Sequence, residues 1–221
     1  MNIAQNLKNI EADIQKYKIK NKIQLIAATK YVDARVLSKL IAAGITTFGE
    51  NKVQSLLAKR ELIKNEAIDW HFIGHLQTNK IKKIIPFISY IHSVDSLNLA
   101  RAIDLCAKKQ KRKIKILLEI NVSGEESKYG FTIQEIKACF DQFINFDSLV
   151  IMGLMTMAPL GADASITRNI FRQLAQLLDF LKNSNPWCEN LVELSMGMSG
   201  DYQIALEEGA TMIRIGSKLF Q

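Results

Sequence analysis

Apolar and polar positions along the chain follow two patterns that alternate. In the first, apolar residues recur at three- and four-residue spacing, which is typical of a helix with one buried face, as in residues 2–17 and 33–43. In the second, a short apolar run has no polar alternation, as in Ile23–Tyr31. Such a run is typical of a parallel strand that helices cover on both faces. The sequence therefore opens with a predicted helix, strand and helix.

The same alternation continues to the end of the chain. Further strands are predicted at residues 46–49, 70–74, 90–94, 115–122, 149–157, 191–196 and 212–216, and helices at 51–65, 78–85, 96–109, 132–143, 165–182 and 201–208. Ser96 and Thr132 stand where N-caps belong, and Gly44 and Gly209 where helices should end.

About eight strands, each beside a helix and with no linker between them, predict an α/β fold. We expect one domain over residues 1–221, a (β/α)8 TIM barrel with an extra N-terminal helix. A doubly wound open sheet is the alternative. It would call for a glycine-rich turn after the first strand, and residues 27–35, AATKYVDAR, contain no glycine.

Composition limits the cellular location, the cysteine chemistry and the classes of partner that we expect. No apolar run approaches the roughly 18 to 20 residues of a membrane span, so we expect no membrane association and a cytoplasmic location. Cys106, Cys139 and Cys188 lie far apart, which suits reduced core thiols better than disulfides or a zinc site. The net charge of +7 suggests anionic partners, but the basic run Lys108–Lys115 falls at a predicted helix end, where cations complement the helix dipole. No nucleic-acid-binding signature accompanies it, so we expect no nucleic-acid partner.

Polar residues follow the predicted strands at their carboxyl ends, beginning with Lys30. In a β/α barrel these ends converge on one mouth, where ligands bind. Two histidines, His71 within the predicted strand 70–74 and His75 in the loop after it, are four residues apart, and packing or ligand hydrogen bonds are favoured over metal binding. The set after Lys30 comprises Glu50, Asn51, His75, Gln77, Asn79, Ser93, Asp95, Asn121, Thr156, Ser199, Arg214 and Ser217.

Two glycine-bearing segments indicate the class of ligand. Residues 196–200, MGMSG, and 213–217, IRIGS, each place serine beside glycine after the seventh and eighth strands, so that backbone N–H groups of Gly200, Gly216 and Ser217 can approach an anion. Barrels commonly bind phosphate there. A phosphate site and a lysine at one mouth suggest an aldehyde that carries a phosphate, and pyridoxal 5′-phosphate (PLP) satisfies both requirements.

The sequence resembles the pyridoxal phosphate homeostasis protein family, single-domain relatives of the alanine racemase barrel domain. The motifs that carry the resemblance are ATK at 28–30, FGENKVQ at 48–54, WHFIGHLQTNK at 70–80, IHSVDS at 91–96, NVSGEESKYGF at 121–131, GLMTM at 153–157, LSMGMSGD at 194–201 and RIGSKLF at 214–220. They span nearly the whole chain, in order.

The resemblance implies a PLP-binding barrel of fold type III and a role for each site residue. Lys30 would hold the cofactor as a Schiff base, Ser199, Gly216 and Ser217 would bind the phosphate, and Arg214 would lie by the pyridine nitrogen. Asn51 and Met155 match residues that line the cofactor pocket. No metal ligand and no catalytic residue is implied.

The expected function is PLP binding for intracellular vitamin B6 homeostasis, without catalytic turnover. An arginine at the ring nitrogen keeps that nitrogen unprotonated and the ring a poorer electron sink. In racemase relatives a second domain supplies a tyrosine base, whereas this chain stops at Gln221, just past the eighth strand. A PLP-dependent amino-acid racemase and a basic nucleic-acid-binding protein are the alternative hypotheses. We expect a monomer whose partners are PLP and PLP-dependent apoenzymes.

Overall fold

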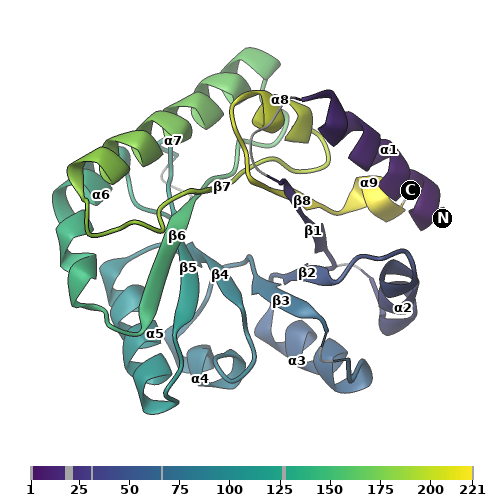
Figure 1. Ribbon diagram of the computed structural model, residues 1–221, viewed down its shortest axis with the longest axis horizontal. Helices are drawn as coiled ribbons and strands as arrows, with labels where there is room; N and C mark the ends of the chain where they lie inside the picture. The colour runs from purple at the N-terminus through teal and green to yellow at the C-terminus, as the bar shows by residue number, and fades with distance from the viewer. Residues whose placement is uncertain (1, 18–21, 31, 66, 126–127, 221) are drawn as a thin grey trace.

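The protein folds as a closed barrel of eight parallel strands, surrounded by helices (Figure 1). The computed structural model describes residues 2–17, 22–30, 32–65, 67–125 and 128–220. Each strand pairs in parallel with the next, and β8 pairs with β1 to close the barrel. The predicted (β/α)8 architecture is therefore confirmed, and the alternative open sheet is wrong.

The elements follow the predicted order. The strands are β1 Gln24–Ala28, β2 Thr47–Glu50, β3 Asp69–Phe72, β4 Tyr90–Val94, β5 Ile114–Glu119, β6 Leu149–Met155, β7 Glu193–Ser195 and β8 Met212–Ile215. The helices are α1 Ile3–Lys16, α2 Ala34–Ala42, α3 Val53–Leu62, α4 Ile81–Ile84, α5 Leu97–Lys109, α6 Ile133–Cys139, α7 Ala164–Ser184, α8 Tyr202–Glu207 and α9 Ser217–Phe220, with 3₁₀ turns η1 Thr78–Lys80 and η2 Phe140–Asn145.

The apolar residues form two separate clusters. A small one fills the barrel interior and takes Ile26, Tyr90, Leu117, Met155 and Met212 from five different strands. The large one lies between the barrel and its helices and contains the buried face of each long helix. Because successive side chains of a strand point to opposite faces, these five strands contribute to both clusters. This explains why they carry apolar residues on both faces.

Local signals fix the helix ends where the sequence predicts them. The hydroxyl oxygen of Ser96 accepts a hydrogen bond from the backbone N–H of Leu99, and Thr132 forms a reciprocal capping box with Glu135. Gly44 and Gly209 follow α2 and α8 with φ of 90° and 91°, a conformation that favours glycine. These four predicted caps are confirmed.

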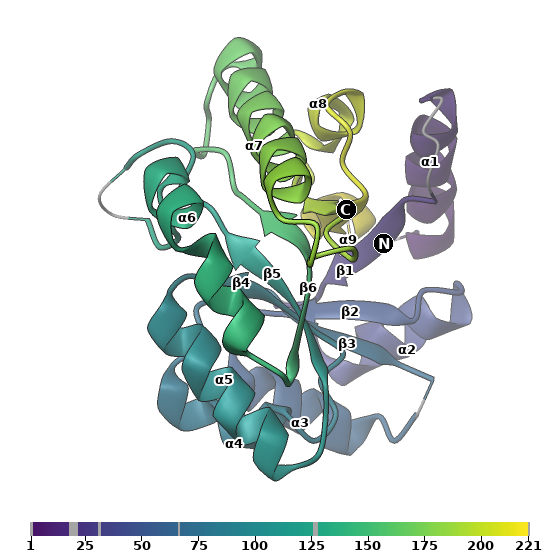
Figure 2. The same cartoon turned by 60° about the vertical axis from the view of Figure 1, so that its left-hand side comes forward.

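Two elements differ from expectation, the last helix and the first strand. The segment after β8 forms the short helix α9, which the sequence pattern does not predict. Helix α1 packs beside α8 and α9 (Figures 1 and 2). The predicted first strand is longer than β1, and its last residue, Tyr31, lies outside the described residues. Among the described residues, no helix combines the length and apolar character that crossing a membrane requires.

Candidate functional site

Two adjacent polar residues after β1 have side chains in different environments. Lys30 follows the strand with an exposed side chain at the barrel mouth. Thr29 is buried, and its hydroxyl donates to a carboxylate oxygen of Glu50, which also accepts from the ammonium of Lys59 in α3. Glu50 therefore belongs to a buried ion pair beneath α3. The strand-end pattern predicts Glu50 at the mouth, and this prediction is wrong.

Asn51 is held at the mouth by a close approach of backbone. A Cβ placed on Gly74, after β3, would lie 2.7 Å from Asn51 Cβ and 2.3 Å from its carbonyl oxygen. Only glycine fits there, because any side chain would displace the loop that carries Asn51. The GENK and FIGH segments of the sequence are thereby fixed against each other.

Arg214 in β8 is the most constrained charged side chain of the site. It is 4% exposed, and one guanidinium nitrogen donates to the carbonyl and hydroxyl oxygens of Ser195 at 2.8 and 2.6 Å. The other terminal nitrogen donates to the carbonyl oxygen of Thr156 at 2.9 Å. Burial lowers its pKa to about 10, so the group stays cationic at neutral pH. These bonds engage three of the five guanidinium N–H donors, and within the described chain two are left for a ligand.

The predicted phosphate segments lie side by side at the ends of β7 and β8. Ser199 Oγ accepts hydrogen bonds from the backbone N–H groups of Gly216 and Lys218, at 3.2 and 3.3 Å. The hydroxyl hydrogen of Ser199 is then directed elsewhere, while a Cβ on Gly200 would meet no atom within 4 Å. Ser217 begins α9 at the same place. The segments thus offer a serine hydroxyl and an open glycine backbone.

The lysine and the phosphate segments come from adjacent strands. β1 pairs with β8 in a register that sets Ala27 against Ile215, and a Cβ on Gly216 would lie 3.3 Å from the carbonyl oxygen of Ala28. Lys30 follows Ala28 by two residues. The predicted Lys30, Gly216 and Ser217 are therefore neighbours along one side of the mouth.

Glu119 and Met155 line the other side, at the ends of β5 and β6, where they are paired in register. Met155 is fully buried in the interior cluster. Burial raises the pKa of Glu119 to about 7, with a further increase from the charge of Asp95 and an opposing effect of Arg214. Glu119 is not among the site residues predicted from the sequence. Period-2 alternation from Lys115 through Leu117 would have pointed to it.

His75 and Asp95 stand beside Glu119 at the rim. His75 Nδ1 lies 3.1 Å from an Asp95 carboxylate oxygen, and the exposed ring of Tyr129 stacks on the imidazole at 3.9 Å between centroids. His71, by contrast, is buried in the barrel and contacts His92. Within the described residues no group of His, Cys, Asp and Glu could hold a metal ion. These contacts agree with the expected packing role of both histidines, and a hydrogen bond from either one to a ligand stays a prediction.

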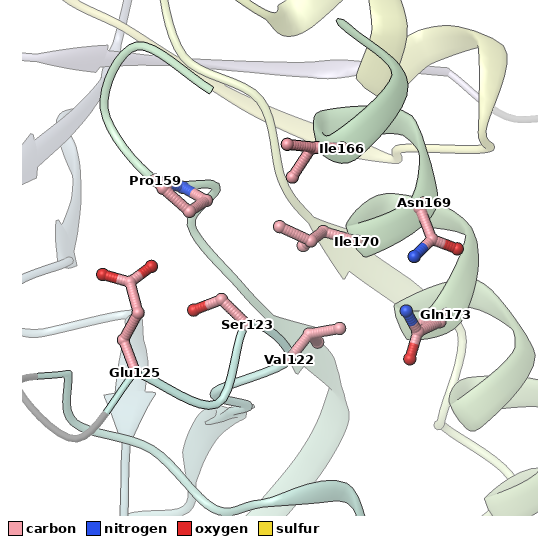
Figure 3. Close-up of a pocket in the computed structure, with 8 residues that line it drawn as sticks. All are labelled: Val122, Ser123, Glu125, Pro159, Ile166, Asn169, Ile170 and Gln173. Carbon is pink, nitrogen blue, oxygen red and sulfur yellow. The ribbon is translucent and has the colours of Figure 1, made fainter. Parts of the chain in front are cut away.

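A cavity of about 380 Å³ opens beside the mouth, between the loops after β5 and β6 and the helix α7 (Figure 3). Its lining residues are Val122, Ser123, Glu125, Pro159, Ile166, Asn169, Ile170 and Gln173. None of these is a predicted cofactor residue.

Comparison with known proteins identifies the family. The model of the family described as alanine racemase, N-terminal domain, matches residues 2–221. A protein of Aquifex aeolicus named pyridoxal phosphate homeostasis protein is 38% identical over 225 residues, which cover 100% of this chain and 98% of the relative. The chain belongs to the pyridoxal phosphate homeostasis protein family.

Solved structures agree with this family assignment. PipY of Synechococcus elongatus PCC7942, solved with PLP bound, is 36% identical, has a TM-score of 0.89, and aligns over 99% of this chain and 100% of its own. An alanine racemase of Clostridium difficile 630 is 15% identical with a TM-score of 0.77, over 99% of this chain and 56% of the racemase. At that identity the second likeness shows the fold alone. The resemblance of the sequence to the homeostasis family is thus confirmed.

Proposed function

We propose that this protein binds PLP at the carboxyl end of the barrel and holds it for intracellular vitamin B6 homeostasis, without turning over amino acids. The aldehyde of PLP supplies an electrophilic carbon with which a lysine amine forms a Schiff base. Lys30 presents an amine at the mouth, two residues past the end of β1, which pairs with β8. The PLP-bound structure of PipY, a relative at 36% identity, supports the choice of ligand.

The observation that carries the proposal is Arg214. Three N–H donors of this guanidinium are bonded to protein acceptors, and within the described residues the other two remain for a ligand. An acceptor on the ligand would satisfy one of them, and the pyridine nitrogen of PLP is an acceptor only when unprotonated. Arg214 would therefore hold the ring nitrogen in its unprotonated form.

The phosphate segments also fit the group. The hydroxyl of Ser199, already oriented by two backbone N–H donors, can donate to an anion, and the backbone at Gly200 is open for close approach. Ser217 adds a hydroxyl at the start of α9. The donors on this side of the mouth thus match a phosphate, and those of Arg214 match a ring nitrogen.

Absorbance spectroscopy tests the lysine. Purified protein incubated with PLP should show the visible band of a lysine-bound cofactor, and Lys30→Ala should abolish it. Lys39→Ala, an exposed lysine of α2, is the control and should keep the band. A band that persists in Lys30→Ala would contradict the assignment.

The phosphate is tested by comparing PLP with pyridoxal, which lacks it. Because a set of charge-assisted hydrogen bonds would be lost, we expect pyridoxal to bind at least tenfold more weakly. Ser199→Ala should weaken PLP binding and leave pyridoxal binding unchanged. Equal affinities for the two aldehydes would remove the phosphate segments from the proposal.

One observation favours a second candidate, an amino-acid racemase. Racemisation needs proton-transferring groups on both faces of the substrate carbon. Glu119 ends β5, four strands from β1 in the eight-stranded barrel, so it stands across the mouth from Lys30, with a pKa raised to about 7 by burial. Racemisation of alanine or serine by the PLP-loaded protein at about 1 per second or faster, lost in Glu119→Gln, would establish this activity instead.

A further inference from the structure

A chain of polar side chains runs through the interior of the barrel. His71 Nδ1 lies 2.9 Å from His92 Nε2, and His92 Nδ1 lies 2.9 Å from Ser195 Oγ. Below them His71 Nε2 lies 3.1 Å from a carboxylate oxygen of Asp69, and above them Arg214 donates to Ser195 Oγ. Both imidazoles and Ser195 are fully buried, whereas the Asp69 side chain is 36% exposed at the amino end of β3. The four contacts connect that end of the barrel with Arg214.

The lower end fixes the direction of hydrogen bonding. Burial by itself would raise the pKa of Asp69, but hydrogen bonds from His71 and Ser89 and the charge of Lys115 outweigh it and lower the pKa. An ionised carboxylate only accepts, so His71 must carry its proton on Nε2. In the tautomer that carries only this proton, His71 Nδ1 accepts from His92 Nε2, and His92 Nδ1 accepts from the hydroxyl of Ser195.

The upper end requires the same direction. A guanidinium only donates, so Ser195 Oγ must accept from Arg214, and its own hydrogen is available for His92 Nδ1. Burial holds the pKa of His92 well below its usual range, so this imidazole is neutral. The contacts at both ends are satisfied together when each imidazole carries one proton, on Nε2.

This row of hydrogen-bonded side chains is not suited to carrying protons. Conduction would require Arg214 to release a proton or His92 to become charged beside it, and both are unfavourable. The hydrogen bonds instead orient the side chains of Ser195 and Arg214. His92 holds the hydroxyl hydrogen of Ser195, which turns the Ser195 lone pair toward Arg214. Because the guanidinium is a rigid planar fork, fixing its three bonded N–H groups also fixes the direction of the other two.

We propose that His71 and His92 are positioning residues for Arg214: through Ser195 they aim its two remaining N–H groups at the ring nitrogen of the bound cofactor. The inference rests on the proposed binding of PLP. It assigns a role to two buried histidines that touch no part of the mouth.

Nuclear magnetic resonance of the ¹⁵N-labelled histidines in the protein without cofactor tests the geometry. We expect both rings to be neutral with the proton on Nε2 at pH 7. A proton on Nδ1 of His92, or a charged His71, would overturn the inference. This measurement does not depend on PLP. It can therefore show that the proposed hydrogen-bond directions are wrong even if the proposed function is right.

Spectra of the loaded protein test the consequence. His92→Leu should bind PLP about tenfold more weakly, and its absorbance band should shift between about pH 6 and 9, where the wild-type band stays constant, because the ring nitrogen can then take a proton. His92→Gln keeps an acceptor and a donor at similar positions and should restore affinity to within about threefold. Lys39→Ala, on the exposed face of α2, should leave the band constant.

Ser195→Ala is the second variant, in case His92→Leu does not fold. It removes the hydroxyl while keeping the backbone carbonyl that Arg214 also contacts, and should give the same pH-dependent band. If the wild type binds PLP and Ser195→Ala keeps both the affinity and the constant band, His71 and His92 do not position Arg214. If the wild type binds no PLP, the proposed function itself is wrong.

Discussion

At the scale of single residues, burial decides the chemistry of the barrel mouth. Glu119 and Glu50 are both buried strand-end glutamates, at 7% and 0% exposure. Glu50 contacts the ammonium of Lys59 and the hydroxyls of Thr29 and Ser55. Glu119 has Asp95 and Arg214 as its charged neighbours, and burial dominates, so its pKa is raised to about 7.

The raised pKa of Glu119 predicts how stability changes with pH. Its pKa rises from 4.5 in the unfolded chain to about 7 in the fold, so the contribution is fully present below about pH 4.5 and is lost as the pH rises through 7. Glu119→Gln stays neutral and should be more stable than the wild type at pH 8, by at most about 3 kcal/mol, and nearly equal at pH 4.5. Urea unfolding at both pH values measures this. Glu61→Gln on the exposed face of α3 is the control, and a pH-independent difference for Glu119→Gln would contradict the assignment.

At the scale of elements, one polar cluster joins the first helix to the last. Asp13 of α1 accepts hydrogen bonds from the hydroxyl of Tyr202 and the amide of Gln203, both in α8. The ammonium of Lys218 in α9 donates to the same Tyr202 hydroxyl at 2.9 Å. Since Ser217 precedes Lys218, the cluster ties α1 to the segment with the proposed phosphate donors.

Tyr202→Phe should therefore loosen α9 while keeping the aromatic ring in the core. Losing the hydrogen bonds to Asp13 and Lys218 should cost about 1 to 2 kcal/mol of unfolding free energy. Amide hydrogen exchange in α9 should accelerate more than in α5, which lies away from the cluster. Tyr129→Phe, which removes the hydroxyl of an exposed tyrosine outside the cluster, is the matched control. Unchanged exchange in α9 would show that the cluster does not hold this helix.

The same cluster sets a second pH dependence. Hydrogen bonds from Lys16 and Tyr202 lower the pKa of Asp13 from 3.8 to about 2. Because the folded pKa is the lower one, this contribution is present above about pH 4 and is lost as the pH falls through 2. The protection of α1 amides against hydrogen exchange, taken relative to the intrinsic exchange rate at each pH, should therefore decrease on acidification toward pH 2. Asp13→Asn, which lacks the charge, should not show that change.

At the scale of the whole molecule, the surface predicts a monomer. Large exposed apolar side chains include Leu62, Leu105, Ile144 and Phe180, and these belong to four different elements, α3, α5, η2 and α7. Scattered apolar residues are normal on monomers, whereas stable interfaces need a contiguous patch. Sedimentation analysis should give a single species near 25.0 kDa. A concentration-dependent dimer would contradict this expectation.

The sequence by itself determined the architecture and most of the proposed site. Apolar runs that alternate with helical periodicity are local signals, so the order of elements, the caps at Ser96 and Thr132 and the closed barrel follow from neighbours in the chain. Lys30, Ser199 and Arg214 could be named because ligand-binding residues of a barrel come at strand ends. Their identities needed no knowledge of the register.

Tertiary structure decided which way strand-end side chains face and which of them meet. Glu50 turns outward to Lys59, while Glu119 turns inward, although both end a strand. His71 and His92 are 21 residues apart, and only the pairing of β3 with β4 brings them within 2.9 Å. The physical reason is that the inward or outward direction changes with every residue of a strand, and the strand-end rule does not state that parity. Contacts across the barrel depend in turn on register, which hydrogen bonds between distant segments set.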